Sequence, residues 1–149
     1  MDNLDKHILA ELESDGRQSF SQLGDKVGLS KTPCWNRVKA MQKQGKITQF
    51  AAVLSPESLG LNIHALVHAV VDFSQYQAFE AAIIQHPSVR ACHAVTGDFD
   101  YVLEIHAKDI DDFDTLLRAD LSTLPGVQRF KTSISTRMVK ANGPYTQML

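Results

Sequence analysis

A single helix is predicted by the sequence Ser30-Lys-Thr-Pro-Cys-Trp-Asn-Arg-Val-Lys-Ala-Met-Gln-Lys-Gln-Gly45, which is long enough for about four turns. Ser30 or Thr32 can cap its N-terminus. Pro33 then falls in the first turn, where a missing N–H costs little. Gly45 is a helix stop. The segment therefore carries both a start signal and a stop signal of its own.

The apolar residues of this helix form one narrow stripe facing a small core, because Cys34, Val38 and Met41 recur at i, i+4 and i+7. From Lys26 to Lys46 the chain has six Lys/Arg and no Asp or Glu. A helix that reads DNA needs cations toward the phosphates and polar tips toward the base edges. We expect the DNA contacts to come from Lys31, Thr32, Trp35, Asn36, Arg37 and Lys39. Of these, Trp35 can either touch the DNA backbone or pack at the helix–turn interface.

Two further helical patterns precede this basic helix. The first ends at residues 15–16, and the second runs from about Ser19 to Val27. Residues 28–30 form a short turn, which completes a helix-turn-helix pattern. The β-prone segment 46–54 then predicts a wing strand or a linker strand. The alternative for the whole unit is a helical oligomerisation module whose lysines are only solvated.

Composition places the chain among globular proteins, since 149 residues with 44% hydrophobic content can form one domain or two small ones. No apolar run approaches the roughly 20 residues needed to span a bilayer, and the N-terminus lacks the features of a signal peptide. Cys34 and Cys92 lie far apart with no CxxC, which favours reduced cytoplasmic thiols. Residues 1–54 carry eight Lys/Arg and six Asp/Glu, whereas residues 55–149 carry seven and eleven. We therefore expect only the front part to meet a polyanion.

Residues 61–149 predict a second domain of the α+β class. Strand patterns cover residues 63–73, 90–95, 101–107 and about 128–139, and helical patterns cover 76–85 and about 110–123. The order βαββαβ is that of the ferredoxin-like fold, with four antiparallel strands and helices on one face. The predicted organisation is a winged-helix/helix-turn-helix domain with a hinge strand over 1–54, a linker over 55–60 and a ferredoxin-like domain over 61–149.

One face of the predicted sheet stays uncovered by helices. Leu66, Val70 and Val95 fall on that face, and an exposed apolar face of this kind needs a partner. We expect a second copy of the sheet to cover it, which makes the chain a homodimer. A dimer also lets two recognition helices read half-sites about one DNA turn apart.

The hairpin Gly97-Asp98-Phe99-Asp100-Tyr101 is the most chemically specific feature of the second domain. A glycine bend exposes backbone N–H groups that can bind a carboxylate, and the two aspartates can receive an α-ammonium. These are the two ends of an amino acid. The alternative is an ordinary Gly-Asp turn between two strands, which the spacing alone favours.

Other candidate chemical sites are weaker. His64 and His68 have a chelating spacing for a helix, but on a strand four residues span about 13 Å, so this pair cannot share a metal. His93 and His106 fit sheet-face residues. The acidic run 109–114 fails as an EF-hand loop and suits a helix N-terminus. No catalytic grouping, P-loop or dinucleotide fingerprint occurs, so we expect no enzyme, no cofactor and no metal site.

Four motifs, in order along nearly the whole chain, are Leu29-Ser-Lys-Thr-Pro-Cys-Trp-Asn-Arg-Val-Lys-Ala-Met41, Gly45-Lys-Ile47, Val95-Thr-Gly-Asp-Phe-Asp-Tyr-Val-Leu103 and Leu124-Pro-Gly-Val127. Together they resemble the leucine-responsive regulatory protein/asparagine-operon regulator (Lrp/AsnC, feast/famine) family. The resemblance implies a helix-turn-helix joined by a hinge strand to a regulatory domain of amino-acid metabolism. It also implies dimers that assemble into tetramers, octamers or hexadecamers and bind small amino acids between dimers.

The same resemblance implies an effector site. The matching positions are Gly97, Asp98, Asp100, Tyr101, Ile110, Ser133, Ile134 and Ser135. We expect leucine, methionine, cysteine or a similar amino acid as effector, double-stranded DNA as partner, an octamer as assembly, no membrane, and a nucleoid-associated cytoplasmic location. The predicted function is sequence-specific transcriptional regulation of amino-acid metabolism. The alternatives are an architectural DNA-binding protein that ignores ligands, and an amino-acid-metabolism enzyme or its regulatory subunit.

Overall fold

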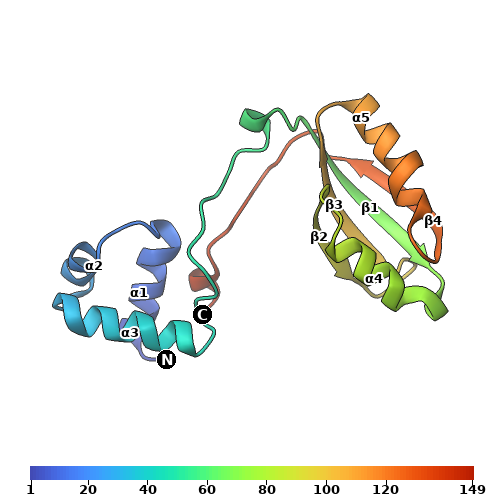
Figure 1. Ribbon diagram of the computed structural model, residues 1–149. Coiled ribbons are helices and arrows are strands. Elements are labelled where there is room, and N and C mark those ends of the chain that lie inside the picture. Colours follow the sequence, from blue (N-terminus) through green and yellow to red (C-terminus); the bar gives the residue numbers. More distant parts are fainter. The chain divides into compact units, whose positions relative to one another are not determined.

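The computed structural model describes residues 1–149 and divides into two compact units (Figure 1). The N-terminal unit comprises Met1–Val53 together with Val139–Leu149, and the C-terminal unit comprises Leu54–Met138. Residues 139–149, which the sequence assigned to the second domain, therefore lie with the N-terminal unit instead. None of the helices combines the length and the apolar composition that crossing a membrane requires.

Three helices build the N-terminal unit: α1 (Asn3–Ser14), α2 (Phe20–Val27) and α3 (Lys31–Lys43). The Ser19 hydroxyl accepts a hydrogen bond from the Gln22 N–H, and the Gln22 side chain accepts one from the Ser19 N–H. This capping box fixes the start of α2. Gly28 (φ 74°) ends α2, and Gly45 (φ 72°) follows the last turn of α3. The predicted helix-turn-helix is confirmed.

The three helices share one apolar core. Cys34, Val38 and Met41 of α3 are at most 2% exposed and pack with Ile8 of α1 and Leu23 of α2. The stripe predicted at i, i+4 and i+7 is therefore the buried side of α3, which leaves its polar and basic residues outside.

The turn between α2 and α3 brings two backbones into contact. A Cβ atom on Gly24 would lie 2.5 Å from the carbonyl oxygen of Leu29, so only glycine fits there without a shift of the backbone. The Leu29 N–H donates a hydrogen bond to the Gly24 carbonyl at 2.8 Å. This close approach sets the start of α3 against α2 and fixes which side of α3 faces outward.

The segment that follows α3 differs from its prediction. Residues 46–54, predicted as a wing or linker strand, contain no strand. The prediction is wrong for the single chain, because an extended segment becomes a strand only when a neighbour takes up its backbone hydrogen bonds, and this segment has no such neighbour.

The C-terminal segment of the chain is hydrogen-bonded to α1 through the carboxylate of Glu13. Glu13 accepts hydrogen bonds from the N–H groups of Tyr145 at 2.6 Å and Thr146 at 3.0 Å, and from the Thr146 hydroxyl at 2.6 Å. The Thr146 hydroxyl is the main reason that the pKa of Glu13 lies below its ordinary value. Residues 145–148 form a short 3-10 turn at this contact.

The C-terminal unit is a four-stranded antiparallel sheet with its helices on one face (Figure 1). Its elements are β1 (Ile63–Val71), α4 (Tyr76–Ile84), β2 (Val89–Ala94), β3 (Tyr101–Ala107), α5 (Ile110–Thr115) and β4 (Val127–Ile134). The strand order β2-β3-β1-β4 and the succession βαββαβ are those of the ferredoxin-like fold. The predicted fold class is confirmed.

Two boundaries in this unit differ from the prediction. The helix predicted over 110–123 changes its hydrogen-bond pattern after α5, with a wide π turn over Leu116–Asp120 and a 3-10 turn over Leu121–Thr123. The last strand ends at Ile134 rather than near Val139, because its pairing with β1 stops there.

Alternation along the strands separates two faces of the sheet. On the core face, Val67, Leu103 and Ile105 are fully buried beneath Phe79 of α4 and Phe113 of α5. The opposite face, which we call the open face, has no helix over it. Its residues are His64, Leu66, His68 and Val70 of β1, Val102, Glu104 and His106 of β3, and Arg129, Lys131 and Ser133 of β4.

Candidate functional site

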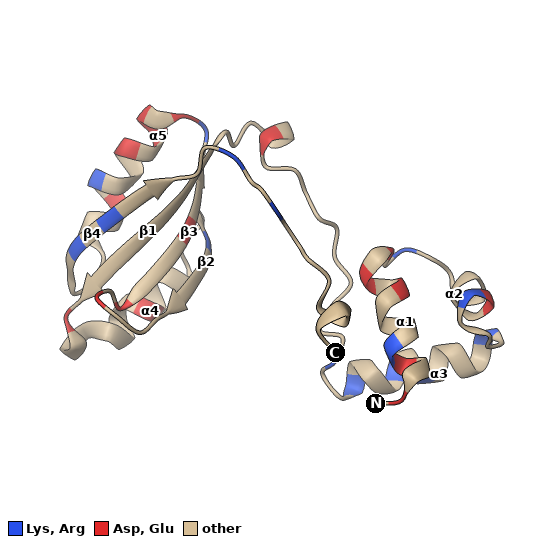
Figure 2. Cartoon of the chain, turned by 180° about the vertical axis from the view of Figure 1, so that it is seen from behind, with Lys and Arg blue, Asp and Glu red and all other residues tan.

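The helix α3 contains Lys and Arg but no Asp or Glu (Figure 2). Its exposed polar and aromatic residues include Lys31, Thr32, Trp35, Asn36 and Lys39. Ser30 is the N-cap residue, but its side chain makes no capping hydrogen bond, so the first N–H groups of α3 are available to an anion. The structure thus brings five of the six predicted DNA-contact residues onto one accessible surface.

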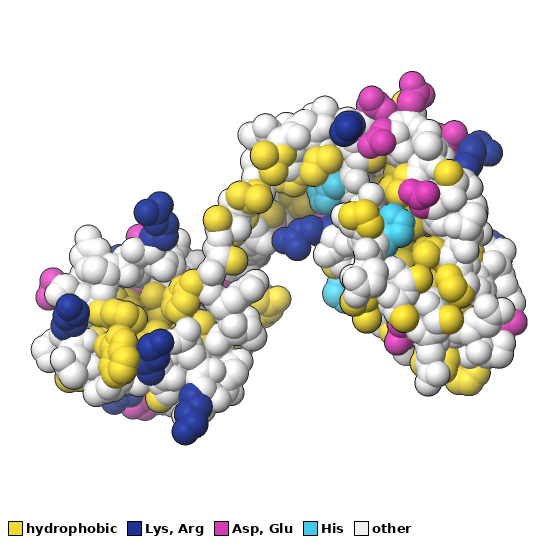
Figure 3. Space-filling view, viewed as in Figure 1, with side chains coloured by type: hydrophobic (Ala, Val, Ile, Leu, Met, Phe, Trp, Pro, Cys, Tyr) yellow, Lys and Arg dark blue, Asp and Glu magenta, His cyan; other side chains and the backbone are white.

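Trp35 lies on this surface and not in the core. Its side chain is 44% exposed, and the Nζ atom of Lys39, one helical turn further on, lies 5.9 Å from the centroid of its ring. Figure 3 shows dark-blue lysine and arginine side chains around hydrophobic surface on the N-terminal unit. An aromatic ring among cations can pack on a sugar–phosphate backbone while the cations neutralise phosphates.

Arg37 is the exception among the predicted DNA contacts. Its Nη1 atom lies 2.8 Å from a carboxylate oxygen of Asp2 and 2.7 Å from one of Asp5. The hydrogen bonds that Arg37 donates to these two carboxylates raise the pKa of Arg37 above its ordinary value. Both acids belong to the start of α1, so Arg37 clamps α3 to α1. These ion pairs give Arg37 a structural role in the free protein, and its DNA contact stays a prediction.

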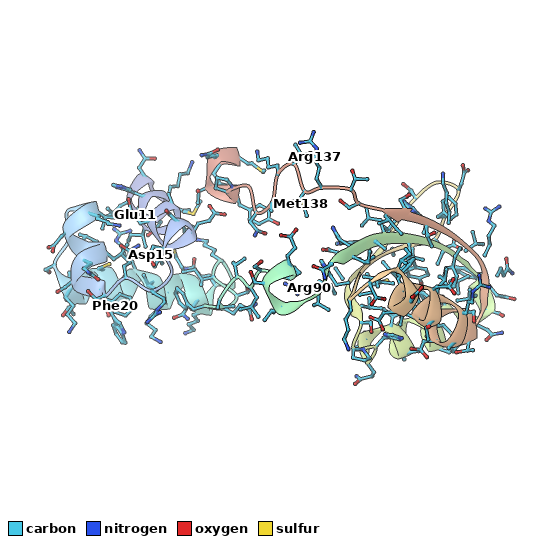
Figure 4. All side chains as sticks on the ribbon, turned by 90° about the horizontal axis from the view of Figure 1, so that it is seen from above. Glu11, Asp15, Phe20, Arg90, Arg137 and Met138 are labelled. Atoms are coloured by element: carbon cyan, nitrogen blue, oxygen red, sulfur yellow. The ribbon has the colours of Figure 1, made fainter.

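A second cation of the acid-free run is also paired with α1. The Nζ atom of Lys26 lies 2.8 Å from a carboxylate oxygen of Glu11, which is labelled in Figure 4. Two of the six cations between residues 26 and 46 are therefore paired with carboxylates in or next to α1. The cations without an ion pair are Lys31, Lys39, Lys43 and Lys46.

In the hairpin between β2 and β3, Asp100 is built into the sheet. Its carboxylate accepts a hydrogen bond from the Val71 N–H at 2.9 Å. Its own N–H donates to the Ala69 carbonyl, and its carbonyl accepts from the Val95 N–H, both at 2.9 Å. Gly97, at φ 114°, makes the bend that precedes it. The polar groups of Asp100, predicted to hold an effector, thus hold the hairpin to the end of β1.

Tyr101 points into the core and away from the open face. It is 6% exposed, its ring lies 4.7 Å from that of Phe79, and its hydroxyl donates a hydrogen bond to Glu80 of α4 at 2.8 Å. Burial raises the pKa of Tyr101 to about 12, and the neighbouring Glu80 carboxylate adds to the shift. Of the predicted effector residues, Tyr101 therefore supports the hairpin from the core side.

Asp98 lies at the edge of a shallow pocket of about 650 Å³ that is also lined by Phe99, Arg129 and Lys131. The Phe99 ring lies 5.3 Å from the ring of His68 and 5.3 Å from the Arg129 guanidinium. The pocket therefore combines one carboxylate with two cations around an aromatic floor. An α-ammonium can approach the carboxylate while an α-carboxylate approaches the cations.

Arg129 and Lys131 were not predicted as site residues, because the sequence places them only within the last predicted strand, about residues 128–139. The register of β4 on β1 places them opposite Val70 and His68, on the open face and beside the hairpin. The cation–aromatic pair with Phe99 fixes Arg129 there. Their alternation along the strand was visible in the sequence, but their position beside the hairpin depends on a pairing register that a single sequence does not state.

The remaining predicted effector residues lie at the opposite end of the sheet. They are Ile110, 54% exposed at the start of α5, with Ile134 and Ser135 at the end of β4 and Ser133 on the open face just before them. The Ser135 N–H donates to the His64 carbonyl, whereas the hairpin is attached at Ala69. Five residues of strand separate these points, about 17 Å. One chain therefore cannot bring both groups of residues to a single small ligand.

A basic helix-turn-helix unit followed along the chain by a ferredoxin-like unit is typical of a DNA-binding regulator with a separate regulatory domain. The model of the AsnC-type helix-turn-helix domain matches residues 1–42, and that of the Lrp/AsnC ligand binding domain matches residues 64–145. The chain belongs to the Lrp/AsnC family of transcriptional regulators.

Relatives of known name and structure agree with this family assignment. The proline dehydrogenase transcriptional activator of Rhizobium radiobacter is 36% identical over 96% of this chain and 94% of its own length. The leucine-responsive regulatory protein of Salmonella typhimurium is 36% identical over 94% and 87%. A transcriptional regulator of Neisseria meningitidis in complex with L-methionine superposes with a TM-score of 0.94 at 31% identity, over 100% of this chain and 99% of that one. A feast or famine regulatory protein of M. tuberculosis, also complexed with L-methionine, gives a TM-score of 0.91 at 26% identity, over 97% and 98%.

Proposed function

We propose that the outer side of α3 contacts DNA through Lys31, Thr32, Trp35, Asn36 and Lys39. The observation that supports this most strongly is the sorting of charges on the helix. Two cations of the acid-free run are paired with α1, while the lysines on the outer side face solvent without an acidic partner. Unpaired lysines beside an uncapped helix start suit phosphates, and the short polar side chains Thr32 and Asn36 suit base edges.

The pocket beside the hairpin is the proposed effector site. Asp98 would receive the α-ammonium of a small amino acid, and Arg129 or Lys131 would receive its α-carboxylate. Phe99 would contact the side chain, which suits an apolar amino acid such as methionine or leucine, with cysteine as a smaller candidate. Two similar regulators are complexed with L-methionine, so L-methionine is the first ligand to test.

We further propose that a second copy completes this site. The hairpin residues and the predicted residues at the far end of the sheet are too far apart within one chain to share a ligand. Two copies placed head to tail bring opposite ends of their sheets together, and a heterologous contact of this kind builds a ring when the rotation between successive copies closes. A ligand held between copies favours one assembly by the difference in its affinity for the two states. The proposed assembly is a homodimer, joined through the open face, that builds an octamer.

In this proposal the protein acts in the cytoplasm, on the nucleoid. The ligand changes which spacing of DNA sites the assembled dimers can occupy together, and the regulated genes belong to amino-acid metabolism. The rival is an architectural DNA-binding protein of the same fold that responds to no ligand. The charged pocket favours the first of the two, because Arg129 and Lys131 of β4 lie beside Asp98 and Phe99 of the hairpin and offer charges of both signs to a zwitterion.

Two measurements on the full chain test the proposal. Fluorescence anisotropy with a DNA duplex from the protein's own upstream region is expected to show binding at low salt that weakens linearly on a log–log plot as KCl rises. A thermal-shift panel of L-amino acids, run with light scattering, is expected to show a shift and a change of mass with at least one apolar member. Indifference to double-stranded DNA at low salt would overturn the DNA-binding surface. Binding to DNA without any response to the panel would favour the architectural protein.

A further inference from the structure

The open face holds a histidine–carboxylate cluster at the end of the sheet away from the hairpin. His64 of β1 is paired directly opposite His106 of β3, and Glu104 is the preceding residue of β3 on the same face. The ligand atoms of the three side chains all lie within 4.8 Å of one another. The antiparallel pairing of β1 and β3, the two central strands, holds His64 opposite His106.

Two distances within the cluster are close to those between neighbouring ligands of one metal ion. The Nε2 atom of His64 lies 3.1 Å from Oε1 of Glu104, and the Nε2 atom of His106 lies 3.5 Å from the same oxygen. On a tetrahedral Zn²⁺ ion with bonds of about 2.0–2.1 Å, two ligand atoms are about 3.3 Å apart. Because the two imidazole rings are stacked and nearly parallel, at least one of them would have to turn out of the stack before both nitrogen atoms could bind the same ion.

The burial of the cluster leaves polar atoms in need of a partner. The side chains of His64, Glu104 and His106 are 20%, 35% and 16% exposed. The two imidazole rings stack, with centroids 4.6 Å apart and planes 3° from parallel. Nδ1 of His106 is buried without a hydrogen bond, and Nε2 of His64, although 3.1 Å from the Glu104 carboxylate, does not have the orientation of a hydrogen bond with it. Buried polar atoms in this state are unfavourable, and an ion bound at Nε2 of His64 would satisfy that atom.

We propose that His64, Glu104 and His106 bind a divalent transition-metal ion, with Zn²⁺ as the first candidate. Two imidazoles and one carboxylate are a ligand set that Zn²⁺ accepts, and they leave a fourth position for water. A bound ion would join β1 to β3 and so stabilise the C-terminal unit. The three residues lie on the open face, so in the proposed homodimer the ion would lie at the interface between the two copies. No metal site was predicted from the sequence, because the spacing of His64 and His68 along one strand does not reveal which residues of the neighbouring strand lie opposite His64.

The test uses the full chain after treatment with EDTA and removal of the chelator. Isothermal titration with ZnCl₂ is expected to show one saturable site per chain. A titration with Co²⁺ is expected to give the visible d–d absorption of a tetrahedral nitrogen–oxygen site. His64→Gln and His106→Gln are expected to abolish both signals, and Glu104→Gln is expected to weaken Zn²⁺ binding roughly tenfold or more.

His68→Gln is the matched control, because His68 lies on the same strand and the same face, four residues from His64. It is expected to bind Zn²⁺ like the wild type. Far-UV circular dichroism checks that each variant is folded. If a variant does not fold, the Co²⁺ spectrum of the wild type still tests whether the site exists. Absence of saturable Zn²⁺ binding in the wild type would overturn the proposal. So would binding that survives in both His64→Gln and His106→Gln, or that is lost equally in His68→Gln.

Discussion

The helix α3 and the hairpin at residues 97–101 each carry two like charges two residues apart. In each pair, one charged side chain makes contacts that hold the fold together, and the other is left accessible to a ligand. On α3, Arg37 is held by two carboxylates of α1, while Lys39 faces solvent over Trp35. In the hairpin, Asp100 is bonded to the end of β1, while Asp98 lines the charged pocket. A matching charge in a motif is therefore not enough to assign a ligand contact.

The two regions also differ in the strength of the contacts made by the residue with the structural role, Arg37 in α3 and Asp100 in the hairpin. Arg37 uses side-chain ion pairs at a partly exposed position, where water and salt weaken the attraction. Asp100 uses its carboxylate, its N–H and its carbonyl on the backbone of neighbouring strands, and the Val71 N–H that it satisfies belongs to a residue only 6% exposed. We expect replacement of Asp100 to disturb the fold more than replacement of Arg37.

The largest expected effect concerns Asp98 and the amino-acid ligand. Asp98→Asn keeps the shape of the side chain but removes its charge, and the loss of a charge-assisted hydrogen bond to an ammonium is worth about 1.5–3 kcal/mol. Titration calorimetry is expected to show affinity for L-methionine, or for whichever member of the panel binds, reduced about ten- to a hundredfold. Asp111→Asn, an exposed aspartate on α5, is the control. Unchanged affinity in Asp98→Asn would remove Asp98 from the site.

The second prediction compares how much each of the two aspartates, Asp100 and Asp98, contributes to the stability of the C-terminal unit. Asp100→Ala leaves the buried Val71 N–H without an acceptor, which is expected to lower the free energy of unfolding of the C-terminal unit by about 1–2 kcal/mol. Asp98→Ala changes an exposed side chain and is expected to stay within about 0.5 kcal/mol of the wild type. Urea denaturation followed by circular dichroism measures both. If the two variants lost equal stability, the distinction between a structural and a ligand-facing aspartate would fail.

The fold followed from local signals that a single sequence contains. The stripe of Cys34, Val38 and Met41 gave the buried side of α3, and the alternation along residues 101–107 gave both faces of β3. The two strand–helix–strand repeats led to the ferredoxin-like order. These features depend on residues close together in the chain, where periodicity reports directly on which side is buried.

The candidate sites depended on long-range pairing that the same sequence does not state. Arg37 meets its acids 32 and 35 positions away, and Asp100 meets Val71 29 positions away. Arg129 reaches the hairpin, and His64 reaches His106, only through strand register. Residue type indicated which side chains could do chemistry, but tertiary contacts determined which of them remain free to do so.

The third prediction concerns Tyr101, whose raised pKa makes the stability of the C-terminal unit depend on pH. The pKa of Tyr101 is raised to about 12 in the folded protein, so the fold favours the neutral phenol. This contribution to stability is complete below the ordinary value of 10.0 and is lost as pH rises from there toward 12, because the unfolded chain releases the proton first. Urea midpoints measured across that range are expected to fall less steeply for Tyr101→Phe than for the wild type. Parallel slopes would mean that Tyr101 titrates in the fold as it does when unfolded.

The smallest expected effect separates the two cations of α3. Lys39→Ala is expected to reduce the slope of log affinity against log salt by about one unit, since one phosphate contact accounts for about 0.9. Arg37→Ala is expected to leave that slope unchanged, because its guanidinium is already neutralised by Asp2 and Asp5. Any loss of DNA affinity in Arg37→Ala should instead follow a lower melting temperature of the N-terminal unit. Anisotropy titrations at several KCl concentrations, with thermal melts of the same samples, measure both quantities. A slope reduced in both variants would mean that DNA draws Arg37 away from α1, and the ion pairs would then be a contact of the free protein that DNA replaces.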